Sequence, residues 1–291
     1  MNKVFRFMAV CTFGIVLTTS SIAWAQTYTS VDYPGAIGTN LSGGPNPQGI
    51  AVGEWLDAGG TWHGLVYHNG VFTSFDPPGS TYTVTNFITP QGVIVGQYND
   101  SGGVSHGFLL TNGQYTKVDY PNAAGAALTG MNPSGEISGY YCVDSACTNI
   151  HGFTRSKKGQ FAASFEPPGA LESVAAMVIP SGAIVVDYWT DSPPANAGAH
   201  CGLLYHEKFA NTDFPGGTWT ICGGANASGD IVGETEIGGM VHAFLLSNGV
   251  FTSFDYPGAT LTVATGINPG GIIGGFYLDA MGNWHGFIRT P

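Results

Sequence analysis

Residues 250–259, VFTSFDYPGA, are the clearest copy of a ten-residue phrase that occurs six times along the chain. The other copies lie at residues 27–36, 71–80, 114–123, 161–170 and 208–217. Each copy carries an acid two residues before a proline, and successive acids are 42 to 47 residues apart: Asp32, Asp76, Asp119, Glu166, Asp213 and Asp255. A fixed period in this range indicates a repeat architecture.

A second unit recurs between the phrases, and its clearest copy is GINPGGIIGGFYLDAMGNWHGFIRT at residues 266–290. It predicts an Asn-Pro turn, a β-branched strand, an Asp/Gly turn and a strand containing His-Gly-Phe. Asn-Gly pairs before three of the phrases, such as Asn248-Gly249, predict hairpin turns. A short apolar stretch before the Asn-Pro turn, such as residues 261–268, adds a further strand. Four strands in each repeat are typical of a β-propeller blade.

The order of these units predicts a closed ring. The chain begins with a phrase, and its sixth His-containing unit has no phrase after it. The N-terminal phrase can supply that missing strand and so remove an open sheet edge. We therefore predict an all-β fold with almost no helix, in which residues 26–291 form a single six-bladed β-propeller. Each blade has about four antiparallel strands, and the N-terminal strand closes the ring. The longest departure from the repeat, residues 191–199, predicts a long loop in the fourth blade.

The first 25 residues differ from the rest of the chain. Two basic residues, Lys3 and Arg6, precede an apolar run that ends in Ala23-Trp24-Ala25. This pattern predicts a cleaved signal peptide over residues 1–25, with Gln26 as the first mature residue. An uncleaved membrane anchor is the alternative, but the run is short and ends in a good cleavage site. We expect secretion to the periplasm or the extracellular space, and no membrane span in the mature chain.

Charge and cysteine usage restrict the partners. Without Lys3 and Arg6, 6 basic residues face 19 acidic ones, so the mature chain carries a net charge of about −13. This charge argues against nucleic acid and anionic membranes as partners. Four cysteines remain in the mature chain, and an oxidising compartment predicts two disulfides. Cys142 with Cys147 and Cys201 with Cys222 is one of three possible pairings. The spacing does not fit a usual zinc site, and no metal is predicted.

The repeated pattern, with a literal His-Ala-Phe at residues 242–244, resembles the HAF-type extracellular repeat family over residues 27–291. The resemblance implies a secreted, propeller-like bacterial repeat protein and transfers no catalytic residue. The fourth repeat departs most from the pattern, with Val186 in place of the usual glycine. The segment that begins at Asp57 is similar to the Asp-box turn of sialidase-type propellers, where that turn is structural.

Six histidines occupy one repeat position: His63, His106, His151, His200, His242 and His285. They could form a metal ring or acid/base groups, or they could brace each blade with identical hydrogen bonds. The predicted strand that holds them is third from the axis, so they lie on a wide circle and cannot converge on one ion. We therefore predict braces. The phrase acids are predicted to accept backbone N–H bonds, as aspartates in turns often do.

Function is expected where the repeats differ. One position of the second strand holds three carboxylates among unrelated residues: Glu54, Gln97, Tyr140, Asp187, Glu234 and Phe276. If Glu54, Asp187 and Glu234 lie at one rim of the channel, two of them could act as an acid/base pair or bind a cation. The alternative is three solvated acids at strand ends. The next position is mostly aromatic and predicts packing between blades.

Two tryptophans are candidates for a ligand platform. Trp189 borders the irregular loop and Trp219 lies at a blade junction, so either side chain could stack on a sugar ring or a partner side chain. Trp62 and Trp284 occupy matching repeat positions, and we assign them to blade packing.

The chain lacks the nucleophile-elbow, zinc-protease, P-loop and dinucleotide-binding motifs, and no cofactor is expected. The sequence therefore predicts a secreted, non-catalytic binding or scaffold propeller, acting as a monomer, that recognises an extracellular glycan or surface protein. The alternative is a propeller hydrolase or lyase that acts on polysaccharide with Glu54, Asp187 and Glu234. The fold alone cannot separate the two.

Overall fold

The computed structural model describes residues 26–162, 166–191 and 198–291. The expected signal peptide (residues 1–25) lies outside the described residues, as do 163–165 and most of the expected loop, 192–197. Regular structure in the described part of the chain consists of 23 strands. No helix in this part is long and apolar enough to cross a membrane.

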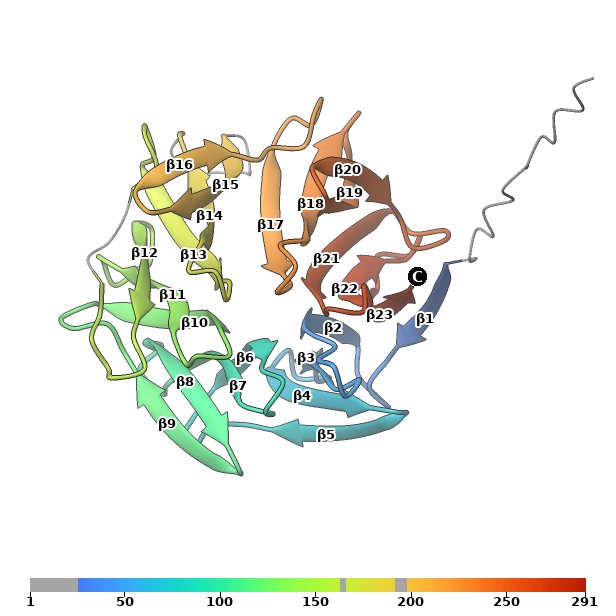
Figure 1. Cartoon of the computed structure of the whole chain (residues 1–291). Coiled ribbons are helices and arrows are strands. Elements are labelled where there is room, and N and C mark those ends of the chain that lie inside the picture. The colour runs from blue at the N-terminus through green and yellow to red at the C-terminus, as the bar shows by residue number, and fades with distance from the viewer. Residues whose placement is uncertain (1–25, 163–165, 192–197) are drawn as a thin grey trace, which may run out of the picture.

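The strands form six antiparallel sheets around a ring, which is a six-bladed β-propeller, as predicted (Figure 1). Blades 1 and 2 contain β2 (Gly38–Gly43), β3 (Ala51–Leu56), β4 (Trp62–His68), β5 (Val71–Phe75), β6 (Tyr82–Ile88), β7 (Ile94–Asn99), β8 (Ser105–Thr111) and β9 (Gln114–Val118). Blades 3 and 4 contain β10 (Gly125–Met131), β11 (Ile137–Cys142), β12 (Ile150–Arg155), β13 (Glu172–Val178), β14 (Ile184–Trp189), β15 (Ala199–Tyr205) and β16 (Lys208–Asn211). Blades 5 and 6 contain β17 (Thr220–Ala225), β18 (Ile231–Ile237), β19 (Met240–Ser247), β20 (Val250–Phe254), β21 (Leu261–Ile267), β22 (Ile273–Leu278), β23 (Trp284–Thr290) and β1 (Thr27–Val31).

The N-terminal strand closes the ring, as the repeat order predicted. β1 pairs antiparallel with β23, from Thr27 opposite Thr290 to Val31 opposite Gly286. Figure 1 shows β1 as the outer strand of the blade that also holds the C-terminal end of the chain. Val31 is 1% exposed and belongs to one apolar cluster with Leu41 and Leu65 of blade 1. The strand that completes blade 6 therefore also packs against blade 1.

Within the described residues, the sheet of blade 3 contains β10, β11 and β12. The phrase expected to form its outer strand pairs through an isolated bridge between Arg155 and Phe161. The rest of that expected strand, residues 163–165, lies outside the described residues.

The inner strand of every blade carries a β-bulge near its middle. The second strand comes so close to this bulge that a Cβ at Gly53 or Gly275 would lie about 2 Å from a carbonyl oxygen of the inner strand. A residue larger than glycine would clash at this position, which explains why the second unit carries glycine there in most blades. Blade 4 carries Val186 at this position, fully buried.

The described residues contain two disulfides, in the pairing that the sequence analysis named among the three possible ones. Cys142–Cys147 closes a short loop within blade 3. Cys201 of β15 and Cys222 of β17 join blade 4 to blade 5.

The topology gives the ring two different faces. On one face, which we call the turn face, lie the Asn-Pro turns between first and second strands and the hairpins between third and fourth strands. On the other, which we call the acid face, lie the Asp/Gly turns between second and third strands. The acid face also carries the connections from each outer strand to the next blade, which contain the phrase acids.

Removal of β1 is expected to destabilise the whole ring. A chain that begins at residue 36 loses the pairing with β23 and the buried Val31, and it leaves a bare sheet edge. We expect the melting temperature, measured by circular dichroism, to fall by at least about 10 °C relative to the chain that begins at Gln26. A synthetic peptide of residues 26–35 should restore much of the loss. An unchanged melting temperature would contradict this view of ring closure.

Candidate binding cleft between the last and first blades

The repeat histidines form the predicted braces. In every blade the Nδ1 atom lies 2.6 to 2.9 Å from a carboxylate oxygen of a phrase acid. His285 of β23 thus pairs with Asp32, 253 positions away, across the closure of the ring. The sequence predicted that the phrase acids accept backbone N–H bonds, and this prediction was wrong about the donor. They accept mainly from the imidazole N–H of the third strand, although Asp213 also accepts the Cys201 backbone N–H.

Three of these histidines also contact a second acid on their other side. The Nε2 atoms of His63, His106 and His285 lie 3.3 to 3.5 Å from Asp57, Asp100 and Asp279. Burial alone would lower the pKa of His63, but hydrogen bonds and charge from Asp76 and Asp57 outweigh it and raise that pKa. Asp279 accepts bonds from the backbone N–H and the side-chain amide of Asn283 and from the backbone N–H of Met281, and these bonds lower its pKa to about 2.

Aromatic rings connect these braces across the blade junctions. Tyr33 stacks on Trp55 with 4.3 Å between ring centres, and Tyr256 stacks on Tyr277 at 3.7 Å. The same second-strand ring also stacks on the repeat histidine, as Tyr277 does on His285 at 5.0 Å. The predicted packing of this aromatic position between blades is confirmed.

A cleft of about 300 Å³ opens on the acid face between blades 6 and 1. Its lining comes from the two ends of the chain: Asp32, Tyr33, Ala36, Ile37, Gly38, Thr39, Asn283, Trp284 and His285. The absence of a side chain at Gly38 leaves room beside Trp284, because a Cβ there would lie 3.3 Å from the Trp284 Cβ. Trp284 is half-buried and packs edge to face on Phe276. Ile37, at 56% exposed, adds an apolar rim.

The polar groups of the cleft are held in place by hydrogen bonds. Asp32 accepts from Ser30 and His285, yet 48% of its side chain remains exposed. The Asn283 amide donates to Asp279 at 2.9 Å. A tryptophan that lines the cleft together with an oriented carboxylate and amide suits a ligand that has both apolar and hydrogen-bonding faces.

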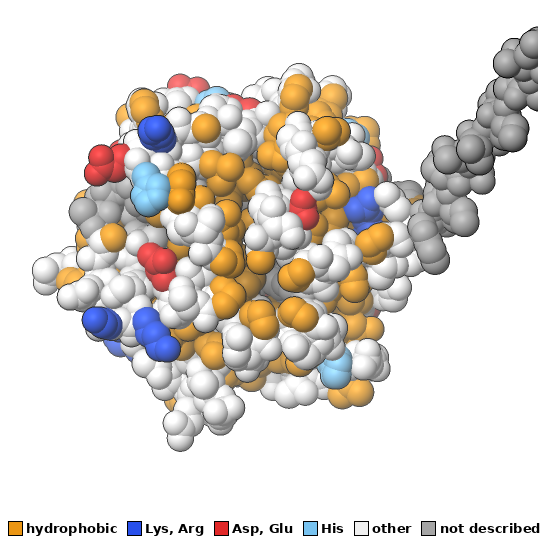
Figure 2. Space-filling view, viewed as in Figure 1, with side chains coloured by type: hydrophobic (Ala, Val, Ile, Leu, Met, Phe, Trp, Pro, Cys, Tyr) orange, Lys and Arg blue, Asp and Glu red, His pale blue; other side chains and the backbone are white. Residues whose placement is uncertain are grey.

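A second hollow lies at the centre of the turn face. It has a volume of about 90 Å³ and is lined by the Asn-Pro turns and the ends of the inner strands. Figure 2 shows hydrophobic side chains around the centre of this face. Its asparagines are already engaged: the Asn46 Oδ1 accepts two backbone N–H bonds of its own turn, and its amide donates to the Thr89 carbonyl of blade 2. The hollow is smaller and less polar than the cleft.

Of the carboxylates that the sequence singled out, Glu54 and Asp187 are buried and Glu234 is half-buried, so the interpretation as solvated strand-end acids is wrong. Glu54 is 6% exposed and accepts from Ser42 and Asn40, while burial raises its pKa to about 7. Asp187 is 5% exposed and accepts the Cys222 N–H of the next blade at 2.7 Å. Burial raises the pKa of Asp187 well above its usual value and that of Glu234 to about 7. Their strand position is in the middle of the blades, away from the rim.

The three acids do not form one cluster. Asp187 and Glu234 lie in neighbouring blades, and the charge of Glu234 contributes to the raised pKa of Asp187. Glu54 lies in blade 1, across the ring from blade 4 and Asp187 (Figure 1). Only the Asp187–Glu234 pair could therefore share a substrate bond.

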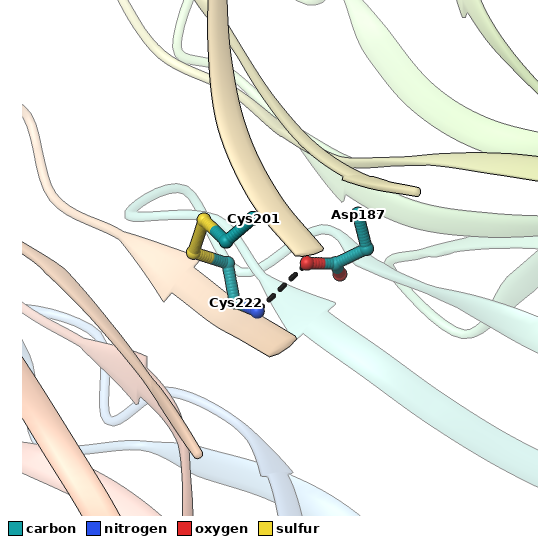
Figure 3. Close-up of side chains that lie close together, drawn as sticks. All are labelled: Asp187, Cys201 and Cys222. Carbon is teal, nitrogen blue, oxygen red and sulfur yellow. Dashed lines mark hydrogen bonds between the residues drawn. A yellow bond between two sulfur atoms is a disulfide. The ribbon is translucent and has the colours of Figure 1, made fainter. Parts of the chain in front are cut away.

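Asp187 also lies beside the disulfide between blades 4 and 5 (Figure 3). Its carboxylate and the sulfur atoms of Cys201 and Cys222 are within 4.8 Å of one another. The two sulfur atoms are bonded to each other, and a metal ligand would require free thiolates. The group is a buried junction between two blades.

Two tryptophans were predicted as platforms for a ligand, and the prediction for Trp219 is wrong. Its side chain is 7% exposed and donates from Nε1 to Glu236 at 2.8 Å, so no ring face is available. Trp189 is half-buried at the end of β14, next to residues outside the described part, and stays a prediction. Trp284 was missed because its repeat position suggested packing alone. The signal that could have found it is its place beside the predicted junction of the two chain ends.

No family model matches the chain, and no curated protein matches it. Solved structures resemble it at low identity. The fungal lectin of Aleuria aurantia, described as a six-bladed β-propeller with a novel fucose recognition mode, has a TM-score of 0.51 at 16% identity, over 86% of this chain and 90% of that one. A putative TolB from Agrobacterium tumefaciens reaches 0.52 at 14%, over 84% and 90%. A streptogramin B lyase reaches 0.50 at 11%, over 91% and 98%. These likenesses establish the propeller fold alone.

Replacement of Glu54 by glutamine is expected to stabilise the protein in a pH-dependent manner. The folded state holds a proton on Glu54 up to about pH 7, whereas the unfolded chain loses it near the ordinary glutamate pKa of 4.5. Stability from the buried group is therefore complete below pH 4.5 and is lost as the pH rises through 7. Glu54→Gln should gain less than about 1 kcal/mol in unfolding free energy at pH 5, and on the order of 3 kcal/mol at pH 8.

Urea unfolding at both pH values measures this difference, with Glu207→Gln, at an exposed position of the turn face, as the control. An equal effect of Glu54→Gln at pH 5 and pH 8 would contradict a pKa of Glu54 that burial raises to about 7.

Proposed function

We propose that this protein is a secreted, non-catalytic binding propeller that recognises an extracellular glycan through the cleft between blades 6 and 1. The observation that carries the proposal is the cleft of about 300 Å³ in which Trp284 lies beside Asp32, Asn283 and His285. A sugar ring has an apolar face that can stack on an indole and hydroxyl groups that can bond to a carboxylate and an amide.

Several further observations support a binding role. The repeat histidines and phrase acids are engaged with each other in all six blades, as structural braces rather than as free acid/base groups. A fucose-recognising lectin is among the proteins of similar fold. Two disulfides fit an oxidising, extracellular compartment, in agreement with the predicted signal peptide. We also propose, from the repeated motifs alone, that the chain is a member of the HAF-type extracellular repeat family and acts as a monomer.

The second candidate is a hydrolase or lyase that acts on polysaccharide with Asp187 and Glu234. Their proximity and raised pKa values favour it, since such groups can donate protons near neutral pH. Against it, Asp187 is 5% exposed and its Oδ1 already accepts the Cys222 N–H. A substrate bond would have to reach the interior of a blade junction. A binding role without catalysis therefore has the stronger support, with a surface protein as the partner if no glycan binds.

Substitution of Trp284 tests the proposal. Native affinity electrophoresis of residues 26–291, through gels that each contain one polysaccharide, should reveal retardation by at least one polymer. Trp284→Ala should weaken this retardation by about tenfold or more, because a central aromatic contact carries much of the binding free energy. Trp189→Ala is the control for the other half-buried tryptophan and should bind as the wild type does.

Recovery of shortened polymer from the gel would overturn the non-catalytic proposal and favour the Asp187–Glu234 pair. No retardation by any polymer would favour a protein partner.

A further inference from the structure

The charges of the mature chain are divided between the two faces of the ring. Thirteen of the carboxylates lie on the acid face: Asp32, Asp57, Asp76, Asp100, Asp119, Asp144, Glu166, Glu172, Asp191, Asp213, Glu236, Asp255 and Asp279. The only basic side chain among them is Lys117, which is paired with Asp119 at 3.0 Å. The other basic residues after residue 25 lie on the turn face: Arg155, Lys157, Lys158, Lys208 and Arg289. Figure 2 looks onto that face, where Lys and Arg side chains are visible and few acids are.

The cleft between blades 6 and 1 lies within this acidic field. Asp32 lines it, and Asp279 lies directly behind His285, at 3.5 Å from its Nε2. Arg289, the basic residue of the same strand, lies at the opposite end of β23 and packs over Phe254 at 4.2 Å. No lysine or arginine is among the residues that line the cleft. A negatively charged ligand would therefore enter against the field of the whole face.

The exposed carboxylate of Asp32 has capacity for one more partner. Its Oδ1 accepts from His285 and its Oδ2 from Ser30, which fixes its orientation while 48% of the side chain remains exposed. A carboxylate oxygen accepts more than one hydrogen bond, and an ammonium donor would add charge to that bond. Trp284 lines the same cleft, and an indole ring attracts a cation as well as an apolar ring surface.

We propose that the cleft binds a sugar that carries a protonated primary amine, such as the glucosamine unit of a deacetylated amino-sugar polymer. The sugar ring lies against Trp284 and its ammonium group pairs with Asp32. This inference rests on the proposed glycan-binding function and adds the class of sugar. Uronic acids and sulfated sugars are excluded by their charge, and an N-acetylated sugar lacks the cation that Asp32 recognises.

Isothermal titration calorimetry on residues 26–291 tests this choice with two short ligands, the tetramer of glucosamine and the tetramer of N-acetylglucosamine. They share the ring and the linkage and differ in the charged amine. We expect the glucosamine tetramer to bind at least about fivefold more tightly at low salt, which is the range of one exposed ion pair. The advantage should shrink at high salt because the pair is partly exposed.

Two matched variants separate the cleft from general attraction to an acidic face. Asp32→Asn removes the negative charge of the proposed partner and leaves its bond to His285 without charge assistance. Asp255→Asn makes the same change in the brace to His242, at the junction of blades 5 and 6. Both variants lose one charge and weaken one His contact, so similar melting temperatures should result. We expect Asp32→Asn to abolish the preference for the glucosamine tetramer and Asp255→Asn to keep it.

Each other result overturns the inference. Equal affinity for the two tetramers would refute recognition of the amine and leave the proposed glycan binding intact. Equal loss in both variants would mean attraction to the whole face without a site. Tighter binding of tetralysine than of the glucosamine tetramer would point to a basic peptide ligand. If neither tetramer nor any polysaccharide binds, this inference and the proposed function both fail.

Discussion

The pairing of β1 with β23 is the constraint on which the rest of the structure depends. It covers the last sheet edge of blade 6, and it buries Val31 against Leu41 and Leu65 of blade 1. The same strand brings Asp32 to His285, and the residues that follow it form one wall of the cleft. Closure of the ring and formation of the candidate site are therefore one event, which joins segments more than 250 residues apart.

Each repeat is held together by a polar His–acid pair and by an apolar interior. Exposed His–acid pairs contribute little free energy each, but their repetition orients the third strand against the phrase in every blade. The fully buried aromatic rings of the third strands, Phe108, Phe153, Phe244 and Phe287, supply hydrophobic stabilisation. The candidate cleft combines a repeated acid and a repeated histidine, Asp32 and His285, with a position where the blades differ. Gly38, which leaves space beside Trp284, is that position.

Repetition made the fold predictable from the sequence, since six weak strand patterns in register reinforce one another. The blade number, the closing strand and the His braces followed from it, whereas the two disulfides were expected from the even cysteine count and the predicted compartment. The burial and the contacts of individual side chains could not be predicted in this way, because they depend on neighbours that the repeat does not specify. The period placed Glu54 and Asp187 on second strands without showing that the adjacent blade buries them. The period also did not indicate that Glu236 would accept a hydrogen bond from the Trp219 indole N–H. Nor did it indicate that the residues around Trp284 would form a cleft.

The most direct test of the central claim is the indole N–H spectrum of ¹⁵N-labelled protein during titration with the glucosamine tetramer. Residues 26–291 contain five tryptophans, and substitution of each one assigns its signal. Trp55 and Trp219 already donate to Ser74 and Glu236 and serve as internal references. We expect the Trp284 signal to shift in a saturable manner while the Trp189 signal stays in place. A shift confined to Trp189, or saturable binding that leaves Trp284 unchanged, would contradict it.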